Sequence, residues 1–188
     1  MKKIKLVPHK VEYAEQMSQL SSASQVKEAL GLSDKQTSLV GTIDFIRFIQ
    51  DEEKSGKQYS RVIMNEDEKL IGVITLKELD SEKKTSHIGT WIGSPYWGQG
   101  YNQLVKAEML YIAFHHLGLE YVFAGARKVN IRSQKAQIKL PYMSIGVEKE
   151  FPKEHRKLEN QEGVPCVLNV VRKNHFIDWY ENFYSTLF

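Results

Sequence analysis

The sequence has almost no cysteine and no long hydrophobic run, and each shortage removes a class of protein. Cys166 is the only cysteine among 188 residues, so no disulfide can form within the chain, and a reducing compartment is expected. No uninterrupted apolar stretch approaches the length that spans a bilayer. We therefore expect a cytoplasmic protein that has no membrane partner.

The chain also has little excess charge. It holds 26 Lys and Arg against 23 Asp and Glu, which leaves a formal net charge of +3. This balance predicts no nucleic-acid partner, although a mildly basic surface suits a small anionic ligand. Hydrophobic residues make up 41% of the chain, enough for one buried core at this length. We expect a single domain over residues 1–188, without repeats or linkers.

The first half of the chain predicts a strand, a group of helices and then three strands. In chain order, we expect a strand at Ile4–Val7, a helix over 11–20, a helix capped by Ser24 and ended near Gly31, a loop over 33–41, a helix capped by Thr42 and ended by Gly56, and strands over 59–64, 70–76 and 85–92. Short turns join the three strands, so they should form an antiparallel meander. Gly72 and Gly89 within them indicate bulges or close backbone approach.

The second half predicts helices and strands in alternation. In chain order, we expect a buried helix over 101–117 stopped by Gly118, a strand over 119–126 parallel to the strand over 85–92, a helix over 131–140 ended by Pro141, a strand over 144–149, a charged loop over 152–163, a strand over 164–171 and a helical tail over 175–184. The aromatic tail should dock either on the body of the chain or on a second copy, and the second alternative would make the protein a homodimer.

Residues 91–103 connect the strand over 85–92 to the helix over 101–117. They read Trp-Ile-Gly-Ser-Pro-Tyr-Trp-Gly-Gln-Gly-Tyr-Asn-Gln. Gly98 and Gly100 let backbone N–H groups approach an anion, and the helix start at about Tyr101 adds unpaired N–H groups and the positive end of its dipole. The stretch therefore predicts a phosphate or pyrophosphate site.

Two other phosphate-binding turns fit this stretch less well. A Walker loop needs Gly-Lys-Ser/Thr after its second glycine, whereas Gly100 is followed by Tyr101 and Asn102. A dinucleotide fingerprint needs a third glycine where Gln103 stands, and a βαβ unit where consecutive antiparallel strands are expected. Glu120 lies roughly where a ribose-binding acid would fall, but one acid in a charged chain is weak support for that alternative.

Residues 97–102, Trp-Gly-Gln-Gly-Tyr-Asn, resemble motif A of the GNAT superfamily of acetyl-coenzyme-A-dependent N-acetyltransferases. In that motif a Gln/Arg-x-x-Gly-x-Gly/Ala turn holds the pyrophosphate of the cofactor. The Tyr-Trp-Gly-x-Gly-Tyr wording over 96–101 is similar to the RimJ/RimL-like branch, the ribosomal-protein N-terminal acetyltransferases, where Trp commonly replaces the first residue of the motif. Asn102 departs from the small residue that is usual at its position.

A second resemblance lies downstream. Asn-Ile-Arg-Ser over 130–133 and Lys-Leu-Pro-Tyr over 139–142 are similar to motif B, Asn-x-x-Ser/Ala followed by Lys-Leu-Gly-Phe. Pro141 and Tyr142 replace the usual Gly-Phe, which should alter the exit of that helix and keep an aromatic plug. The two motifs and the elements between them cover about residues 86–142.

The resemblance implies a fold and a cosubstrate. The fold class is α/β (α+β): a mixed, mostly antiparallel, seven-stranded twisted sheet flanked by helices, with a parallel pair of strands, four and five, that splay apart to hold acetyl-CoA. The expected cofactor-binding residues are Trp91, Ile92 and Gly93 along the pantetheine arm, and Trp97, Gly98, Gln99, Gly100, Tyr101, Asn102 and Gln103 at the pyrophosphate. Phe45 and Phe48 would flank the acceptor pocket, where they either shape substrate choice or only pack on the sheet.

The same resemblance assigns chemistry to the motif B helix. Many relatives place a Tyr acid seven residues beyond the motif B Asn, where this chain has Gln137. Ser133 would contact the sulfur of the cofactor, and Asn130 would bond the pantetheine arm. Asn130 or Ser133 would serve equally well as the cap of this helix, and one residue can both cap the helix and contact the cofactor. Cys166 lies in an apolar run, so we expect an inert thiol and no covalent acetyl-enzyme.

His87 is the candidate base. Strand alternation places His87, Gly89 and Trp91 on one face, and RimJ/RimL-like relatives often carry an acid where His87 stands. A free imidazole, with a pKa of about 6.5, is mostly neutral and therefore basic in the cytoplasm. The alternative is a histidine that fills an edge-strand position and bonds a neighbour. Arg127 and Lys128 likewise either meet cofactor phosphate or form a solvated strand end.

Two functions stay open. The first is an enzyme that acetylates a primary amine of a small molecule or peptide, whether a protein N-terminus, a polyamine or an aminoglycoside, by direct attack. The second is a non-catalytic CoA-binding module, which Asn102, Gln137 and the Pro141-Tyr142 change would suit. We expect no metal, because His115 and His116 are adjacent on a helix and point in different directions.

Overall fold

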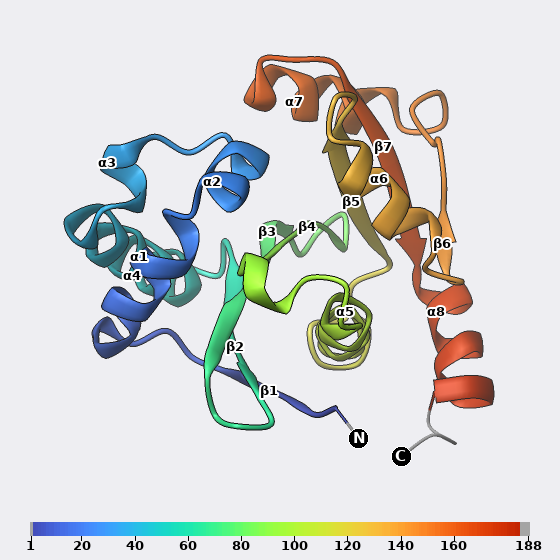
Figure 1. Ribbon diagram of the computed structural model, residues 1–188. Helices are drawn as coiled ribbons and strands as arrows, with labels where there is room; N and C mark the ends of the chain where they lie inside the picture. The colour runs from blue at the N-terminus through green and yellow to red at the C-terminus, as the bar shows by residue number, and fades with distance from the viewer. Residues whose placement is uncertain (1, 185–188) are drawn as a thin grey trace. The chain divides into compact units, whose positions relative to one another are not determined.

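The computed structural model describes residues 2–184, which form one seven-stranded sheet flanked by helices (Figure 1). The strand order is β1-β2-β3-β4-β5-β7-β6, and β4 runs parallel to β5. The β1–β2, β2–β3, β5–β7 and β6–β7 pairs are antiparallel. The expected fold class is confirmed. The strands are β1 (Ile4–Val7), β2 (Tyr59–Asn65), β3 (Leu70–Asp80), β4 (Thr85–Ile92), β5 (Tyr121–Arg127), β6 (Met143–Ser144) and β7 (Cys166–Arg172).

Over residues 2–184, eight α-helices and four short helical segments accompany the sheet. The α-helices are α1 (Ala14–Ser21), α2 (Ser24–Leu30), α3 (Asp34–Thr37), α4 (Leu39–Lys54), α5 (Tyr101–Tyr111), α6 (Ile131–Ile138), α7 (Pro152–Glu162) and α8 (Lys173–Trp179). The short segments are the 3₁₀ turns η1 (Val11–Tyr13) and η2 (Ser94–Tyr96) and the π-helical turns η3 (Ile112–His116) and η4 (Tyr180–Tyr184). Within residues 2–184, no helix is long and apolar enough to cross a membrane.

The chain forms two compact units that share β4 and α5. The first unit comprises the residues up to Leu79 together with Gly89–Met109, and the second comprises Asp80–Ile88 and the residues from Leu110 onward.

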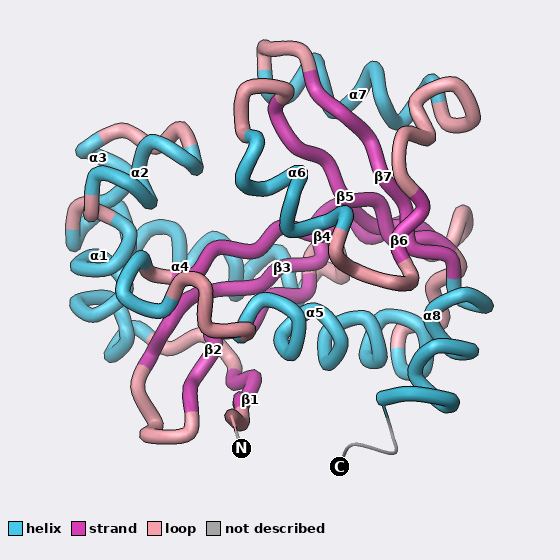
Figure 2. The backbone as a smooth tube through the Cα atoms, turned by 45° about the vertical axis from the view of Figure 1, so that its right-hand side comes forward, coloured by secondary structure: helices cyan, strands magenta, loops and turns pink. Residues whose placement is uncertain are grey.

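In the first unit, the helices α1 to α4 gather as one group (Figure 2). Met17 and Ile46 from these helices pack with Val62 and Val73 from the strands in a core that excludes water. Phe45 packs against this core, which is one of the two alternatives expected for that residue. Phe48, by contrast, is 52% exposed, so it does not pack on the sheet.

The predicted loop over 33–41 is wrong, because two serines begin helices there. Ser33 caps α3 in a capping box: its Oγ accepts from the Gln36 N–H at 3.3 Å, and the Gln36 side chain accepts from the Ser33 N–H at 2.9 Å. Ser38 caps α4 by accepting from the Gly41 N–H at 3.1 Å. Thr42, the expected cap, is already inside the helix and donates to the Ser38 carbonyl. Ser24 is likewise the first residue of α2 and not its cap.

In the second unit, aromatic and aliphatic side chains form a core between β5, β7 and the segments that follow β6. Phe123, Leu168 and Val170 are buried there, with Phe151 and Leu158 packed against them. The C-terminal tail docks on the same unit: the Phe176 ring of α8 lies 5.4 Å from Phe114 and 5.2 Å from Tyr142. Tyr142 thus keeps the aromatic plug that motif B predicted.

The charged segment over 152–163 is a helix, and the predicted loop is wrong. Pro152 occupies the first turn of α7, where its missing N–H costs nothing, and Gly163 closes the helix in the left-handed region at φ 67°. The predicted strand over 144–149 is mostly wrong as well. Gly146, at φ 68°, ends β6 after Ser144, and the Asn169 and Glu148 side chains bond the backbone N–H groups of Gly146 and Leu168.

The long helix expected over 101–117 changes geometry partway along. The regular turns of α5 end at Tyr111, and one π-helical turn, η3, carries the chain on to His116. Gly118, at φ 66°, then stops it as predicted. Of its 17 residues over 101–117, eight are buried and five are half-buried, which agrees with its apolar pattern.

Candidate active site

The end of β4 lies against β3 in the first unit, where the backbones approach too closely for a side chain. A Cβ at Gly72 would collide with the carbonyl oxygen of Trp91, so the close approach predicted for this glycine is confirmed. The Gly93 N–H donates to the Ile71 carbonyl at 2.8 Å. These contacts fix the strand end that leads into the glycine turn.

Two side chains tie the turn back to its own backbone. Trp97 Nε1 donates to the Ile92 carbonyl at 2.6 Å, and Gln99 Nε2 donates to the Pro95 carbonyl at 2.8 Å. Trp97 therefore holds the turn to β4, the work expected of a large aromatic with one N–H donor. Gln99 is exposed, and its Oε1 accepts from Lys2 Nζ at 3.0 Å.

Both glycines of the turn adopt backbone conformations that favour glycine. Gly98 has φ 72° and Gly100 has φ 87°, and an added Cβ at either position would have no described atom within 4 Å. The conformation thus requires glycine at these two positions, although the protein leaves space beside them. Backbone with open space beside it, followed directly by α5, fits a pyrophosphate.

Tyr101 anchors the start of α5. Its side chain is 3% exposed, and its hydroxyl donates to Glu66 Oε2 at 2.9 Å. Burial, followed by this hydrogen bond, raises the pKa of the Tyr101 hydroxyl. The side chain is thus occupied by protein contacts, so only the backbone of Tyr101 is left to meet a ligand. Asn102 is half-buried and Gln103 is exposed.

Lys106 is an unusual feature of the same helix. The residue is only 7% exposed, and burial lowers the pKa of its ammonium to about 8. A buried lysine costs stability whenever it is charged.

In the second unit, the parallel pairing of β4 with β5 is short. The register joins Thr85 with Tyr121, Ser86 with Val122 and His87 with Phe123. β5 continues for four further residues to Arg127 and pairs with β7 along that length.

Asn130 caps α6. Its Oδ1 accepts from the Ser133 N–H at 3.0 Å, so the capping role that the sequence left open is confirmed for Asn130. Ser133 does not cap the helix, and its Oγ lies 3.4 Å from Gln137 Nε2.

Gln137, which stands where many relatives have a Tyr acid, links the helix to the sheet. Its Nε2 donates to the Gly125 carbonyl at 3.2 Å, and its Oε1 accepts from Asn169 Nδ2 at 2.6 Å. The side chain is 3% exposed, and both of its ends are engaged with β5 and β7. Gln137 therefore has a structural role that the sequence did not reveal.

His87 lies beside a carboxylate that the sequence did not single out as its partner. His87 Nε2 is 2.9 Å from Glu154 Oε2 on α7, and the imidazole packs against the Phe123 ring with 5.2 Å between centroids. The side chains of His87 and Glu154 are 13% and 21% exposed. The sequence did not reveal this pair, because a loop is expected where Glu154 lies. Pro152 and Gly163 are nevertheless ordinary signals for the start and the stop of a helix.

The remaining candidates of the second unit are engaged or inert. Arg127 pairs with Glu162 at 2.6 Å, a contact that the sequence did not suggest for it. Cys166 is fully buried, and burial raises the pKa of its thiol, which suits the inert sulfur expected. Within residues 2–184, no cluster of His, Cys, Asp and Glu could hold a metal ion.

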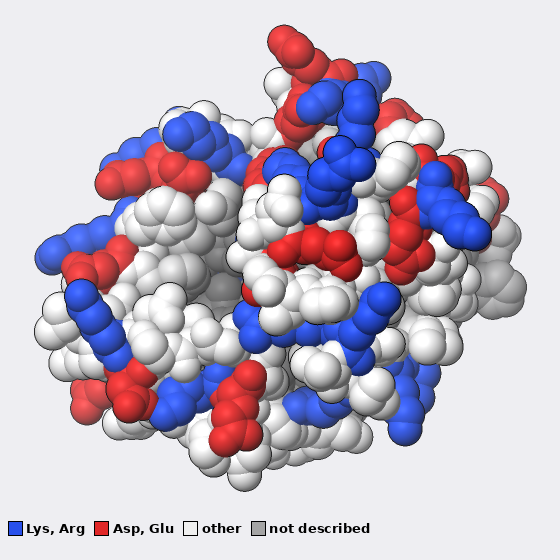
Figure 3. All heavy atoms as spheres, turned by 90° about the horizontal axis from the view of Figure 1, so that it is seen from above, with Lys and Arg blue, Asp and Glu red and all other residues white. Residues whose placement is uncertain are grey.

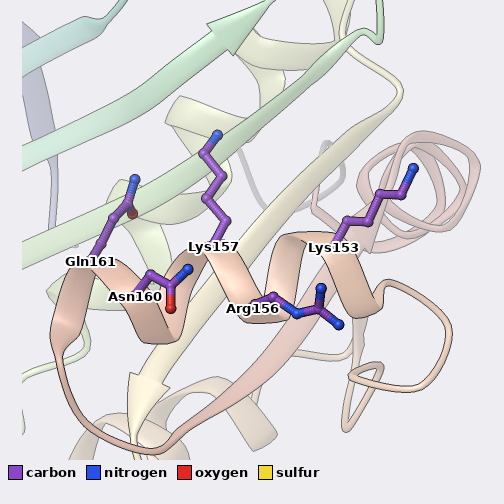
Figure 4. A pocket seen from close by; sticks show the side chains of 5 residues that line it. All are labelled: Lys153, Arg156, Lys157, Asn160 and Gln161. Carbon is purple, nitrogen blue, oxygen red and sulfur yellow. The ribbon is translucent and has the colours of Figure 1, made fainter.

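The outer face of α7 carries an open hollow. Its lining consists of five polar side chains from this one helix, Lys153, Arg156, Lys157, Asn160 and Gln161 (Figure 4). Ligand pockets usually have walls from several elements, whereas every residue that lines this hollow comes from one helix. On the face of the molecule seen in Figure 3, basic and acidic side chains are interspersed, with no broad stripe of one sign.

Residues 3–141 match the family described as "Acetyltransferase (GNAT) domain". The chain has no significant match among curated protein sequences.

Solved structures share the fold at low sequence identity. Mycobacterium smegmatis RimJ in complex with CoA-disulfide has a TM-score of 0.71 at 16% identity, over 91% of this chain and 82% of that one. Spermidine N-acetyltransferase from Vibrio cholerae, in complex with CoA and spermine, has a TM-score of 0.71 at 9% identity, over 93% and 98%. The microcin C7 self-immunity acetyltransferase MccE, in complex with acetyl-CoA and AMP, has 0.71 at 18% identity, over 90% and 91%. Because the family match extends over well more than half of the chain, from residue 3 to residue 141, the protein belongs to the GNAT acetyltransferase family.

Proposed function

We propose that this protein is an acetyl-CoA-dependent N-acetyltransferase that transfers an acetyl group directly to a primary amine. The observation that carries the proposal is the open glycine turn, with Gly98 and Gly100 in the left-handed region immediately before α5. The structural neighbours that bind CoA, acetyl-CoA or amines support it by analogy of fold. The proposal places the enzyme in the cytoplasm, and a RimJ/RimL-like branch is its preferred subfamily.

The backbone from Trp97 to Gln103 would hold the pyrophosphate, and Trp91, Ile92 and Gly93 would bond the pantetheine arm. Acetyl-CoA supplies a thioester whose acetyl group an amine can attack without a covalent enzyme intermediate. A fixed turn suits this work, because binding energy is best used when the groups that bind are already in place. Trp97 provides that fixation through its bond to the Ile92 carbonyl.

The protons of the reaction are assigned to side chains of the second unit. His87 would accept one proton from the ammonium form of the substrate, which leaves a nucleophilic amine. Ser133 would donate a hydrogen bond to the sulfur as negative charge develops there, and Asn130 would bond the pantetheine arm with the amide N–H groups that its cap leaves unused. The buried Cys166 has no part in this scheme.

The acceptor is an amine of a small molecule or a peptide. A protein N-terminus, a polyamine and an aminoglycoside are the three classes to compare. The test is the release of CoA thiol from acetyl-CoA across a panel that contains one member of each class. Thiol release that depends on one amine class supports the proposal and names its acceptor.

A second candidate function is a CoA-binding module without catalysis. Gln137 favours it, because both ends of that amide are bound within the protein and no Tyr acid stands in its place. CoA binding by calorimetry with no thiol release on any member of the panel would establish this alternative in place of the enzyme.

A further inference from the structure

Glu154 is held in a fixed place because α7 is anchored to the second unit along its length. Leu158 packs over Gly125 of β5, where the absence of a side chain lets it approach. Glu159 Oε1 accepts from the Cys166 N–H at 2.9 Å, and Glu162 pairs with Arg127. The carboxylates of this helix therefore all meet donors of the same unit, and Glu154 meets His87.

His87 is also held on several sides. The backbone of β4 pairs with β5 at the step from His87 to Phe123, and the two rings are tilted by only 32°. Glu154 lies at the Nε2 edge of the imidazole. The charged group that faces the pair from the turn after β3 is Lys83, whose Nζ also bonds Asp80 Oδ2 at 3.0 Å.

The protons of the pair follow from its chemistry. An ionised carboxylate only accepts hydrogen bonds, so Nε2 of His87 must carry the proton in their contact. In a neutral imidazole the other nitrogen, Nδ1, then holds the free lone pair. Among residues 2–184, Nδ1 has no hydrogen-bond partner. The pair therefore presents one defined basic atom.

We propose that Glu154 is a positioning residue for the acetyl transfer: it fixes His87 in the Nε2–H tautomer, so that Nδ1 takes the proton of the substrate ammonium. The N–H bond of the ammonium breaks, its electron pair stays on the amine, and an N–H bond forms at Nδ1. The imidazolium that results lies beside the Glu154 carboxylate, which stabilises its charge, and it returns the proton to water. The transfer of a proton from the substrate rests on the proposed function. The His87–Glu154 pair and its tautomer do not depend on that function.

The first test is the tautomer, which requires no turnover. Imidazole ¹⁵N spectra of the labelled full-length protein distinguish a protonated Nε2 from a protonated Nδ1, and His87→Gln identifies the signals by their loss. We expect the Nε2–H form in the parent at pH 8, and a mixture of tautomers in Glu154→Ala. Glu154→Gln should keep the Nε2–H form, because the amide oxygen still accepts.

The second test is kinetic, on the amine that the panel identifies. Glu154→Ala should lower kcat about tenfold or more, with an unchanged KM for acetyl-CoA. General-base catalysis contributes roughly 100-fold or more, and this variant keeps His87 and loses only its orientation. The matched control is Glu159→Gln, which alters the carboxylate of the other His–Glu pair of α7, with His155 at 3.2 Å, and should leave kcat unchanged.

The outcomes separate this inference from the function on which it rests. A parent tautomer that persists in Glu154→Ala, or a kcat that stays at the parent value, would overturn the role of Glu154 even in an active enzyme. If no amine is acetylated, the proposed function fails and the proton transfer fails with it, and the spectra then decide whether Glu154 fixes the tautomer.

Discussion

Replacing Gly100 by valine separates the cost of a strained backbone from the loss of a ligand site. Gly100 has φ 87°, and Gly56, which follows α4, has φ 72°; an added Cβ at either position meets no described atom within 4 Å. A residue with a side chain pays about 1–2 kcal/mol to adopt such a conformation. Gly100→Val and Gly56→Val should therefore lower the free energy of unfolding by similar amounts.

Only the change at Gly100 should weaken CoA binding. The branched side chain would fill the space in which we place the pyrophosphate, and the loss of one or two backbone hydrogen bonds to a charged oxygen costs about 3 kcal/mol. That corresponds to a Kd for CoA that is about 100-fold higher. Calorimetric titration of CoA, with urea unfolding of the same samples, measures both quantities. Parent-like binding by Gly100→Val, or equal loss by Gly56→Val, would refute the assignment of the turn.

Three further predictions follow from other residues. Ser133→Ala should lower kcat more than it weakens CoA binding, since a hydroxyl at the sulfur matters most as charge develops; equal kcat in steady-state assays would leave Ser133 without a catalytic role. Burial, and then the charge of Arg61, lowers the pKa of His9 to about 4, so the unfolded chain binds the proton more tightly. The free energy of unfolding should therefore have its full value above about pH 6.5 and decrease by about 3 kcal/mol as the pH falls to 4. In His9→Asn, the urea midpoints should lack this part of the decrease. Lys106→Met should raise the free energy of unfolding at pH 7 by about 1–3 kcal/mol, because burial holds the pKa of this lysine at about 8; a loss of stability would show that its ammonium is well solvated.

Where local signals are strong, the sequence was sufficient to predict the fold. Strands β1 and β4 have the predicted bounds, because Pro8 ends the first and alternation with a clear turn delimits the second. The start of α5, and the stop at Gly118 of the helical segment that η3 continues, follow from the glycines that flank this segment. In these places the pattern of a few neighbouring residues determines the local structure.

Where stability comes from distant partners, the sequence was not sufficient. The helix α7 has few apolar residues, and its anchors are one leucine and three carboxylates, two of which have partners far away in sequence. His87 and Glu154, for example, are 67 residues apart. The capping serines 33 and 38 are local signals, but the weak apolar pattern after them concealed two helix starts. His87 was thus predicted as a candidate without the neighbour that could orient it.

The most direct test of the account is to identify both products of one reaction. Acetyl-CoA, the enzyme and the amine selected by the thiol-release panel are incubated, and mass spectrometry follows the amine, the released CoA and the intact protein. We predict equal amounts of N-acetylated amine and free CoA thiol, with no acetyl group on the protein. CoA that binds while no amine becomes acetylated, or an acetyl group carried on Cys166, would contradict the proposed direct transfer.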